Sequence, residues 1–315
     1  MAPSRRLLRL AFLLVTLVVA LSSAACGGGV GPGDPGGSAA TGVVRVVTTT
    51  SILADMVTQV GGSRVTVDSL VHKGGEVHTF DPTPGDVRRV AEATLVVRNG
   101  LGLDDWLIHL IANSGTTARV VALGEDLPGV TYLGGSPGDS KAVNPHLWLN
   151  AAYGALYADR IAASLAAVDP AHAAEYRSGA AAYDAILAGI DSDAKTRLGA
   201  IPEANRTVIS FHDAFPYFAA AYGLAIDGTI VDAPGQDPSA SQVAALVNTI
   251  KARGVRAIFA EAQFNPDLAK AIGRETGATV VADLYTDTLG DAPVDTYAGL
   301  MRWNVDTVVA ALGGS

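Results

Sequence analysis

Residues 43–71, VVRVVTTTSILADMVTQVGGSRVTVDSLV, decide the fold of this chain. The apolar run over 43–48 predicts a buried strand, and the helical spacing of apolar residues over 52–60 predicts a helix that stops at Gly61-Gly62. A second run rich in β-branched residues, over 65–71, predicts another strand. A strand, a helix and a strand in this order predict a βαβ unit with two parallel strands.

The alternation of strands and helices continues along the chain and restarts near residue 206. We therefore expect an α/β fold with two similar lobes, each a mostly parallel sheet flanked by helices. The first lobe should add strands over 94–98 and 118–122 and helices over 84–93, 104–112 and 151–168. The second lobe should hold strands over 206–210, 224–231, 257–260 and 279–282, and helices over 214–222, 239–253, 266–276 and 295–312.

A long helical pattern from Pro170 to about Leu198 separates the two lobes. Asp169 supplies an N-cap and Pro170 a proline in the first turn. At 1.5 Å per residue this helix would be roughly 45 Å long, enough to join the lobes as one rigid linker. Gly179 and Gly189 lie inside it and mark possible points of close packing.

The N-terminus has the features of an export signal. Arg5, Arg6 and Arg9 precede an apolar stretch over 10–21 that is too short to span a bilayer comfortably. Small residues follow and lead to Cys26, the single cysteine of the chain. This arrangement resembles a bacterial lipobox, so we expect a lipidated Cys26. A plain cleaved signal peptide and a twin-arginine signal are the alternatives.

Residues after Cys26 are dominated by Gly, Pro and Ser, a composition typical of a disordered tether. The chain should therefore divide into a signal peptide over 1–25, the lipidated Cys26 with its tether over 26–42, a first lobe over 43–168, a linker helix over 169–199 and a second lobe over 200–315.

Composition limits the classes of partner. The chain has 315 residues, of which 49% are hydrophobic and 17% charged, so it can bury substantial cores. Its formal net charge of -9 argues against nucleic acid as a partner.

Four side chains form a candidate metal site: His78, His146, His212 and Asp287. Each follows a short apolar run that predicts a strand, and none shares a local motif with another. Three imidazoles and one carboxylate make a complete tetrahedral ligand set for zinc. Ligands bind at the carboxyl ends of parallel strands, so two ligands from each lobe would place the metal in the cleft between the lobes.

Other residues compete for these roles. Asp283 and Glu261 also lie near predicted strand ends and could replace Asp287. His72 and Glu76 could contribute at the rim of the site. Three further side chains are expected to be structural or solvated: His109, His172 and Trp148.

Seven motifs occur in one order along the chain. They are Thr-Thr-Thr-Ser-Ile from Thr48, His-Thr-Phe-Asp-Pro-Thr-Pro from His78, Asn-Gly-Leu-Gly-Leu from Asn99, Pro-His-Leu-Trp from Pro145, His-Asp-Ala-Phe from His212, Thr-Asp-Thr-Leu from Thr286, and the stretch from Tyr297 to Asn304. As an ordered set they resemble the zinc/manganese substrate-binding proteins of bacterial ABC importers, many of which are lipoproteins. The likeness covers nearly all of the chain after the tether.

The resemblance implies two lobes joined by a rigid helix with the metal between them, in a protein that delivers Zn²⁺, or alternatively Mn²⁺, to a transmembrane permease. We expect a monomer that is lipid-anchored on the outer face of the cell membrane. The resemblance also carries ligand roles onto His78, His146, His212 and Asp287. The third position is His in zinc-type members and a carboxylate in many manganese-type members, so His212 favours zinc. A His- and acid-rich loop common in dedicated zinc members is missing between Val130 and Asn144, which weakens the argument for strict zinc specificity.

Two other classes of function compete with metal transport. A secreted zinc hydrolase would need three His and a water on the metal, with Glu261 or Glu76 as general base. The chain contains no HExxH motif, and a fourth protein ligand, Asp287, would close the position where chemistry occurs. A surface adhesin is the third possibility, although nothing in the sequence requires it. We therefore expect a binding protein and not an enzyme.

Overall fold

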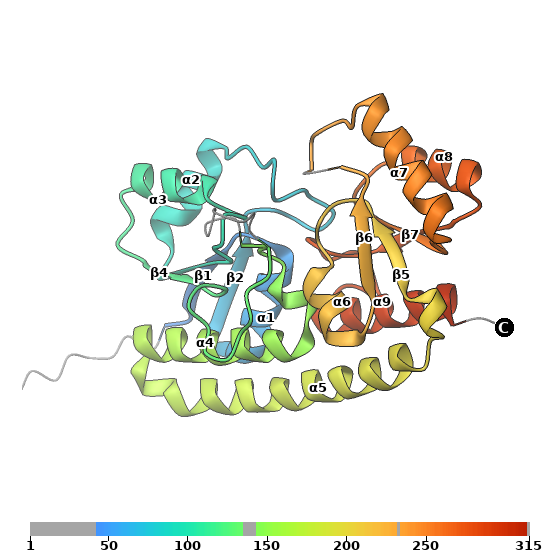
Figure 1. The fold of residues 1–315 in the computed structure, drawn as a ribbon. Coiled ribbons are helices and arrows are strands. Elements are labelled where there is room, and N and C mark those ends of the chain that lie inside the picture. The colour runs from blue at the N-terminus through green and yellow to red at the C-terminus, as the bar shows by residue number, and fades with distance from the viewer. Residues whose placement is uncertain (1–41, 135–142, 232–233, 314–315) are drawn as a thin grey trace, which may run out of the picture. The chain divides into compact units, whose positions relative to one another are not determined.

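The computed structural model of this protein describes residues 42–134, 143–231 and 234–313. Residues 41–315 belong to one compact unit. Two parallel four-stranded sheets, one in each lobe, form its framework (Figure 1). Cys26 and the expected signal peptide lie outside the described residues.

The first lobe has the strand order β2-β1-β3-β4, with every neighbouring pair parallel. Its strands are β1 (Val44–Thr48), β2 (Val65–Ser69), β3 (Leu95–Arg98) and β4 (Arg119–Ala122). Its helices are α1 (Ser51–Gly61), α2 (Pro84–Glu92), α3 (Trp106–Ser114) and α4 (Ala151–Val168). Short 3₁₀ turns occur at Gly62–Arg64 and Leu147–Leu149.

The second lobe repeats this topology with the order β6-β5-β7-β8, again all parallel. Its strands are β5 (Thr207–Ser210), β6 (Ala225–Thr229), β7 (Ala257–Glu261) and β8 (Thr279–Leu284). Its helices are α6 (Pro216–Tyr222), α7 (Ala240–Arg253), α8 (Asp267–Thr276) and α9 (Tyr297–Leu312), and a 3₁₀ turn, Glu203–Asn205, precedes β5. The expected α/β fold with two similar parallel sheets is confirmed.

One long helix, α5 (Ala173–Gly199), connects the lobes after a 3₁₀ turn at Pro170–His172 (Figure 1). It packs against α1 and α4 of the first lobe and α9 of the second. Its buried residues recur every three or four positions, which is the spacing of one helical face. They are Tyr176, Ala180, Tyr183, Leu187, Ile190, Ala194 and Leu198.

Each sheet is covered on both faces, and the inner faces share one core. Alternate strand residues point to opposite faces, so Val46 lies in the shared core and Val47 in an outer one. Helices α2 and α3 cover the outer face of the first sheet, and α7 and α8 that of the second. The shared core runs continuously from β1 through α4 and α5 to α9, so the lobes are not separated by a polar interface.

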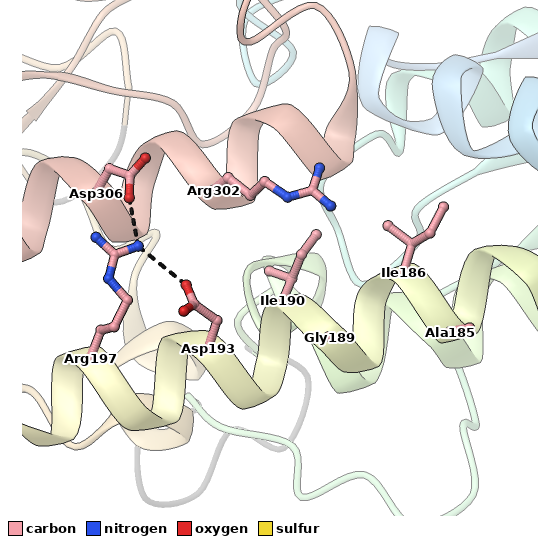
Figure 2. A pocket seen from close by; sticks show the side chains of 8 residues that line it. All are labelled: Ala185, Ile186, Gly189, Ile190, Asp193, Arg197, Arg302 and Asp306. Carbon is pink, nitrogen blue, oxygen red and sulfur yellow. Dashed lines mark hydrogen bonds and ion pairs between the residues drawn. The ribbon is translucent and has the colours of Figure 1, made fainter.

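One contact to each lobe illustrates how α5 is held. A Cβ on Gly179 would overlap the Val60 carbonyl oxygen, so α5 and α1 approach closely, as expected for this glycine. Gly189, in contrast, faces open space. Figure 2 shows the other end of the helix, where a groove of about 420 Å³ separates α5 from α9. There Arg197 donates to Asp306 of α9 at 2.6 Å.

Element boundaries differ from the expected ones by a few residues. Strand β2 ends at Ser69 instead of 71, and β8 extends to Leu284. Helix α6 begins at Pro216, because residues 211–215 turn away from β5 before the helix starts. Among the described residues, no helix combines the length and apolar character needed to cross a membrane.

Candidate metal centre

The four candidate ligands come from four different loops. His212 lies two residues after β5, and Asp287 lies three residues after β8. His78 lies in the loop between β2 and α2, well beyond the end of the strand. His146 directly precedes the 3₁₀ turn Leu147–Leu149 that leads into α4.

The expectation that every ligand follows a strand is wrong for His146. The last strand before it, β4, ends at Ala122. Between them the described residues show only an isolated antiparallel bridge, from Gly134 to Val143. Side chains from elsewhere hold this segment, because the Tyr217 hydroxyl donates to the Asn144 carbonyl at 3.0 Å.

The structure brings all four candidate ligands together. One donor atom from each of His78, His146, His212 and Asp287 lies within 4.8 Å of the others. The Nε2 atoms of His146 and His212 are 3.4 Å apart. Asp287 Oδ1 lies 3.3 Å from His146 Nε2, and its Oδ2 lies 3.4 Å from His212 Nε2 and 3.7 Å from His78 Nε2. Donors about 2.1 Å from a tetrahedral zinc ion would be separated by roughly 3.4 Å, so these distances match such an ion.

Three of the four side chains are almost completely buried. The side chains of His146, His212 and Asp287 are 3%, 2% and 0% exposed, whereas that of His78 is 20% exposed. Within the described part of the chain, His78 Nε2 and Asp287 Oδ1 are buried without a hydrogen-bond partner. Leaving such atoms unpaired costs free energy, and an ion coordinated between them would satisfy both.

Neighbouring side chains fix the orientation of the imidazoles. Asn144 Nδ2 donates to the Asp213 carbonyl at 2.6 Å, which leaves Asn144 Oδ1 facing His146 Nδ1 at 2.9 Å. Glu261 Oε1 similarly lies 3.1 Å from His212 Nδ1. Because each Nδ1 faces an acceptor, each Nε2 can direct its lone pair towards the ligand cluster.

The electrostatic environment shifts the pKa values of His78 and His212 in opposite directions. Burial, with support from the neighbouring His146 and His212, lowers the pKa of His78 to about 4. Burial also disfavours the charged form of His212, but the attraction of Glu261 and Asp287 outweighs it and raises the pKa of His212 to about 9. The pKa of Asp287 is lowered, because the three imidazoles outweigh its complete burial.

Burial and the charge of Asp287 raise the pKa of Glu76 to about 7. Its Oε1 accepts the His78 backbone N–H at 2.8 Å, so Glu76 shapes the loop that carries His78. Neither Glu76 nor Glu261 belongs to the group of converging donor atoms. Glu261 instead supports His212 from the side facing away from the cluster.

The remaining candidates lie outside the cluster. Asp283 is exposed on β8, and its carbonyl accepts the Trp303 indole N–H at 2.6 Å. His72 and His109 are exposed. His172, expected to be solvated, pairs with Asp169 at 2.7 Å.

Trp148 packs beside His146, with ring centroids 5.2 Å apart. Its indole N–H also donates to the Thr286 carbonyl at 2.7 Å, next to Asp287. This hydrogen bond links the two halves of the site. Neither this hydrogen bond nor the role of Gln263, whose side-chain Nε2 lies 3.3 Å from Asp287 Oδ2, is predicted from the sequence. The one signal in the sequence that could have indicated Gln263 is its position, as a polar residue shortly after a predicted strand.

Comparisons with known proteins identify relatives of the chain. The family described as zinc-uptake complex component A, periplasmic (ZnuA) matches residues 46–311. The metal ABC transporter substrate-binding lipoprotein FimA of Streptococcus parasanguinis is 31% identical over 285 residues, which cover 87% of this chain and 91% of FimA.

Relatives with similar sequences carry names that refer to different metals. The manganese-binding lipoprotein MntA of Halalkalibacterium halodurans is 30% identical, with 96% of this chain and 99% of MntA covered. The iron ABC transporter substrate-binding lipoprotein MtsA of Streptococcus pyogenes serotype M1 is 29% identical, with 96% of both chains covered. The solved structure of the periplasmic zinc-binding protein TroA from Treponema pallidum aligns with a TM-score of 0.79 at 27% identity, covering 87% of this chain and 100% of TroA.

Proposed function

Since the chain belongs to the zinc-uptake complex component A family and is a substrate-binding protein of a metal ABC importer, we propose that its cargo is Zn²⁺. Proteins of this family bind metals for ABC importers and are not enzymes. The partner is accordingly a membrane permease. The metal is transported cargo and has no catalytic role.

The observation that carries the proposal is the convergence of three imidazole nitrogens and one carboxylate, from His78, His146, His212 and Asp287. Imidazole suits zinc, whereas carboxylate and water suit manganese. Relatives named for manganese and iron show that family membership alone does not identify the metal. The nitrogen-rich donor set is what favours Zn²⁺ here, with Mn²⁺ as the second candidate.

Elemental analysis and one substitution test this proposal. Protein purified without chelator should contain about one zinc per chain, because four donors complete a tetrahedral shell. His146→Ala should lower Zn²⁺ affinity by at least about 100-fold, since even residues behind the ligands account for 10- to 100-fold. His109→Ala, on the exposed face of α3, is the matched control and should bind as the wild type does. Wild-type affinity in His146→Ala would refute the site.

We propose that Cys26 anchors the protein to the membrane. Relatives named as lipoproteins of ABC importers support a location outside the cytoplasm. Cys26 is the single cysteine and follows the apolar segment of the export signal. Dual acylation gives stable membrane attachment where one chain does not. Cys26→Ala should therefore move the protein from the membrane fraction to the soluble fraction, and unchanged partition would show that another feature attaches it.

We further propose that the protein acts as a monomer, with the lobe boundaries expected from the sequence. All four donors come from one chain, so a complete site needs no second copy. Light scattering of the metal-loaded protein should give the mass of a single chain. A dimer that forms only on metal loading would contradict this.

A further inference from the structure

The end of β7 and the segment that follows it supply no member of the donor cluster, yet they contact both ligand candidates of the second lobe. Glu261, the last residue of β7, faces His212 Nδ1 at 3.1 Å. Phe264 packs edge-on against the His212 ring, with centroids 5.5 Å apart. Gln263, between them, reaches Asp287. Strands β7 and β8 are hydrogen-bonded neighbours, so this segment and the Asp287 loop leave the sheet side by side.

Gln263 makes two hydrogen bonds through its amide nitrogen. Gln263 Nε2 donates to Thr286 Oγ1 at 3.0 Å and to Asp287 Oδ2 at 3.3 Å. An ionised carboxylate can only accept, so the NH₂ group and not the carbonyl oxygen must face Asp287. The orientation of this amide is therefore determined by the candidate ligand itself.

The two carboxylate oxygens of Asp287 consequently differ. Both oxygens face the donor cluster, but only Oδ2, which lies 3.4 Å from His212 Nε2 and 3.7 Å from His78 Nε2, also accepts a hydrogen bond from Gln263. Oδ1 is buried and has no hydrogen-bond partner among the described residues, although it lies 3.3 Å from His146 Nε2. If Oδ1 takes the metal and Oδ2 keeps the amide, both buried oxygens are satisfied. A carboxylate that binds the ion through both oxygens would have to share Oδ2 with Gln263.

We propose that Gln263 determines metal selectivity by keeping Asp287 a ligand through one oxygen. This inference rests on the proposed function, because it explains how the same site prefers zinc. A single oxygen with three imidazoles gives the four-coordinate geometry that suits Zn²⁺. Manganese is typically bound in oxygen-rich sites of higher coordination, so it gains more from a second carboxylate oxygen. Gln263 is a positioning residue that acts through Asp287.

Gln263→Met tests the proposal, because methionine has a similar length and no donor. Competition titrations should show the ratio of Zn²⁺ to Mn²⁺ affinity falling by at least about tenfold, within the range for residues that support metal ligands. The visible spectrum of the Co²⁺-loaded protein provides a second readout, because it reports the coordination number of the metal and not the overall stability of the fold. Four-coordinate Co²⁺ absorbs visible light more strongly than five- or six-coordinate Co²⁺, so the Gln263→Met bands should weaken.

Gln59→Met is the matched control. Gln59 Nε2 donates to the Asp55 carboxylate at 3.0 Å on the exposed surface of α1, so the same substitution removes the same type of bond away from the donor cluster. Its affinity ratio and Co²⁺ spectrum should equal those of the wild type. Gln263→Glu is a second variant that keeps the side-chain size, removes the donor and adds a carboxylate, and it should shift both readouts in the same direction as Gln263→Met.

The outcomes separate this inference from the proposed function. Wild-type protein that binds no metal, or that prefers Mn²⁺, would contradict the zinc proposal. Wild-type protein that prefers Zn²⁺, together with unchanged ratios and spectra in folded Gln263→Met or Gln263→Glu, would overturn the role of Gln263 alone. Circular dichroism establishes that each variant is folded before it is titrated.

Discussion

His212 should be positively charged, with both ring nitrogens protonated, in the metal-free protein at neutral pH. Glu261 and Asp287 overcome the effect of burial and raise its pKa to about 9. Since Nδ1 faces Glu261, a metal that binds Nε2 must displace the Nε2 proton. Metal uptake at pH 7 should therefore release about one proton from His212, and affinity should fall about tenfold for each pH unit below the pKa.

Calorimetry in buffers with different ionisation enthalpies measures this release as a slope. His78, whose pKa is lowered to about 4, is already neutral at pH 7 and should add nothing. Glu261→Gln removes the carboxylate beside His212, so it should lower the His212 pKa and reduce the slope. A slope near zero in the wild type would show that His212 is neutral before the metal arrives.

The type of donor at position 212 offers a second prediction. His212→Glu replaces an imidazole with a second carboxylate, which can bind through two oxygens and favours manganese. Zn²⁺ affinity should fall by at least about tenfold and the gap between Zn²⁺ and Mn²⁺ should narrow, as measured by competition titration. His109→Glu, at an exposed position on α3, controls for added charge. An unchanged gap would mean that donor type does not control selectivity.

Residue types and their order along the chain predict the four donor residues better than they predict the side chains that hold those donors in place. His78, His146, His212 and Asp287 stand in motifs that the sequence displays, and the structure brings them together. Asn144, Glu261 and Gln263 act through single hydrogen bonds or contacts to those ligands. Such contacts depend on where two loops meet in space, and no periodic pattern in the sequence encodes them.

At the scale of elements, the two glycines of α5 give opposite predictions. Gly179→Ala should destabilise the protein by about 1–3 kcal/mol, because the new methyl group would overlap the Val60 carbonyl oxygen in a tightly packed contact. Gly189→Ala, in open space, should stabilise it by about 0.5–1 kcal/mol through helix propensity. Urea unfolding measures both free energies. Equal effects of the two substitutions would contradict the close approach of α5 and α1.

The strands and helices were predictable because their residues follow simple periods. Strand β1 and helix α4 lie within one residue of their expected ranges. The segment before His146 was not predictable, because tertiary hydrogen bonds such as that from Tyr217 hold it in place of a sheet ladder. Asp283 was a candidate ligand because the strand was expected to end just before it. Strand β8 instead continues to Leu284, and the Asp283 side chain is exposed.

For the whole molecule, the shared core predicts a small response to metal. A large closure of the lobes would break apolar packing that runs through α4, α5 and α9, and it would strain the Arg197–Asp306 pair. We expect metal-free and metal-bound protein to differ chiefly in the loop from Lys73 to Phe80, where Gly74 adopts a positive φ of 76°.

Small-angle scattering and hydrogen exchange together check this expectation. The scattering profiles of the two forms should nearly superimpose, while amides between Lys73 and Phe80 should exchange faster without metal. Exchange in α5 should stay the same in both forms. A clear decrease in the radius of gyration on metal binding would indicate domain closure and contradict the shared-core argument.

The separation of the four donors along the chain has a consequence for quality control. His78 and Asp287 stand near opposite ends of the folded unit, and the cluster takes two donors from each half. A truncated or half-folded chain therefore cannot assemble the full set of donors. Tight metal binding requires that both halves have folded and packed together. A permease that recognises only the metal-loaded form would therefore not engage truncated or half-folded chains.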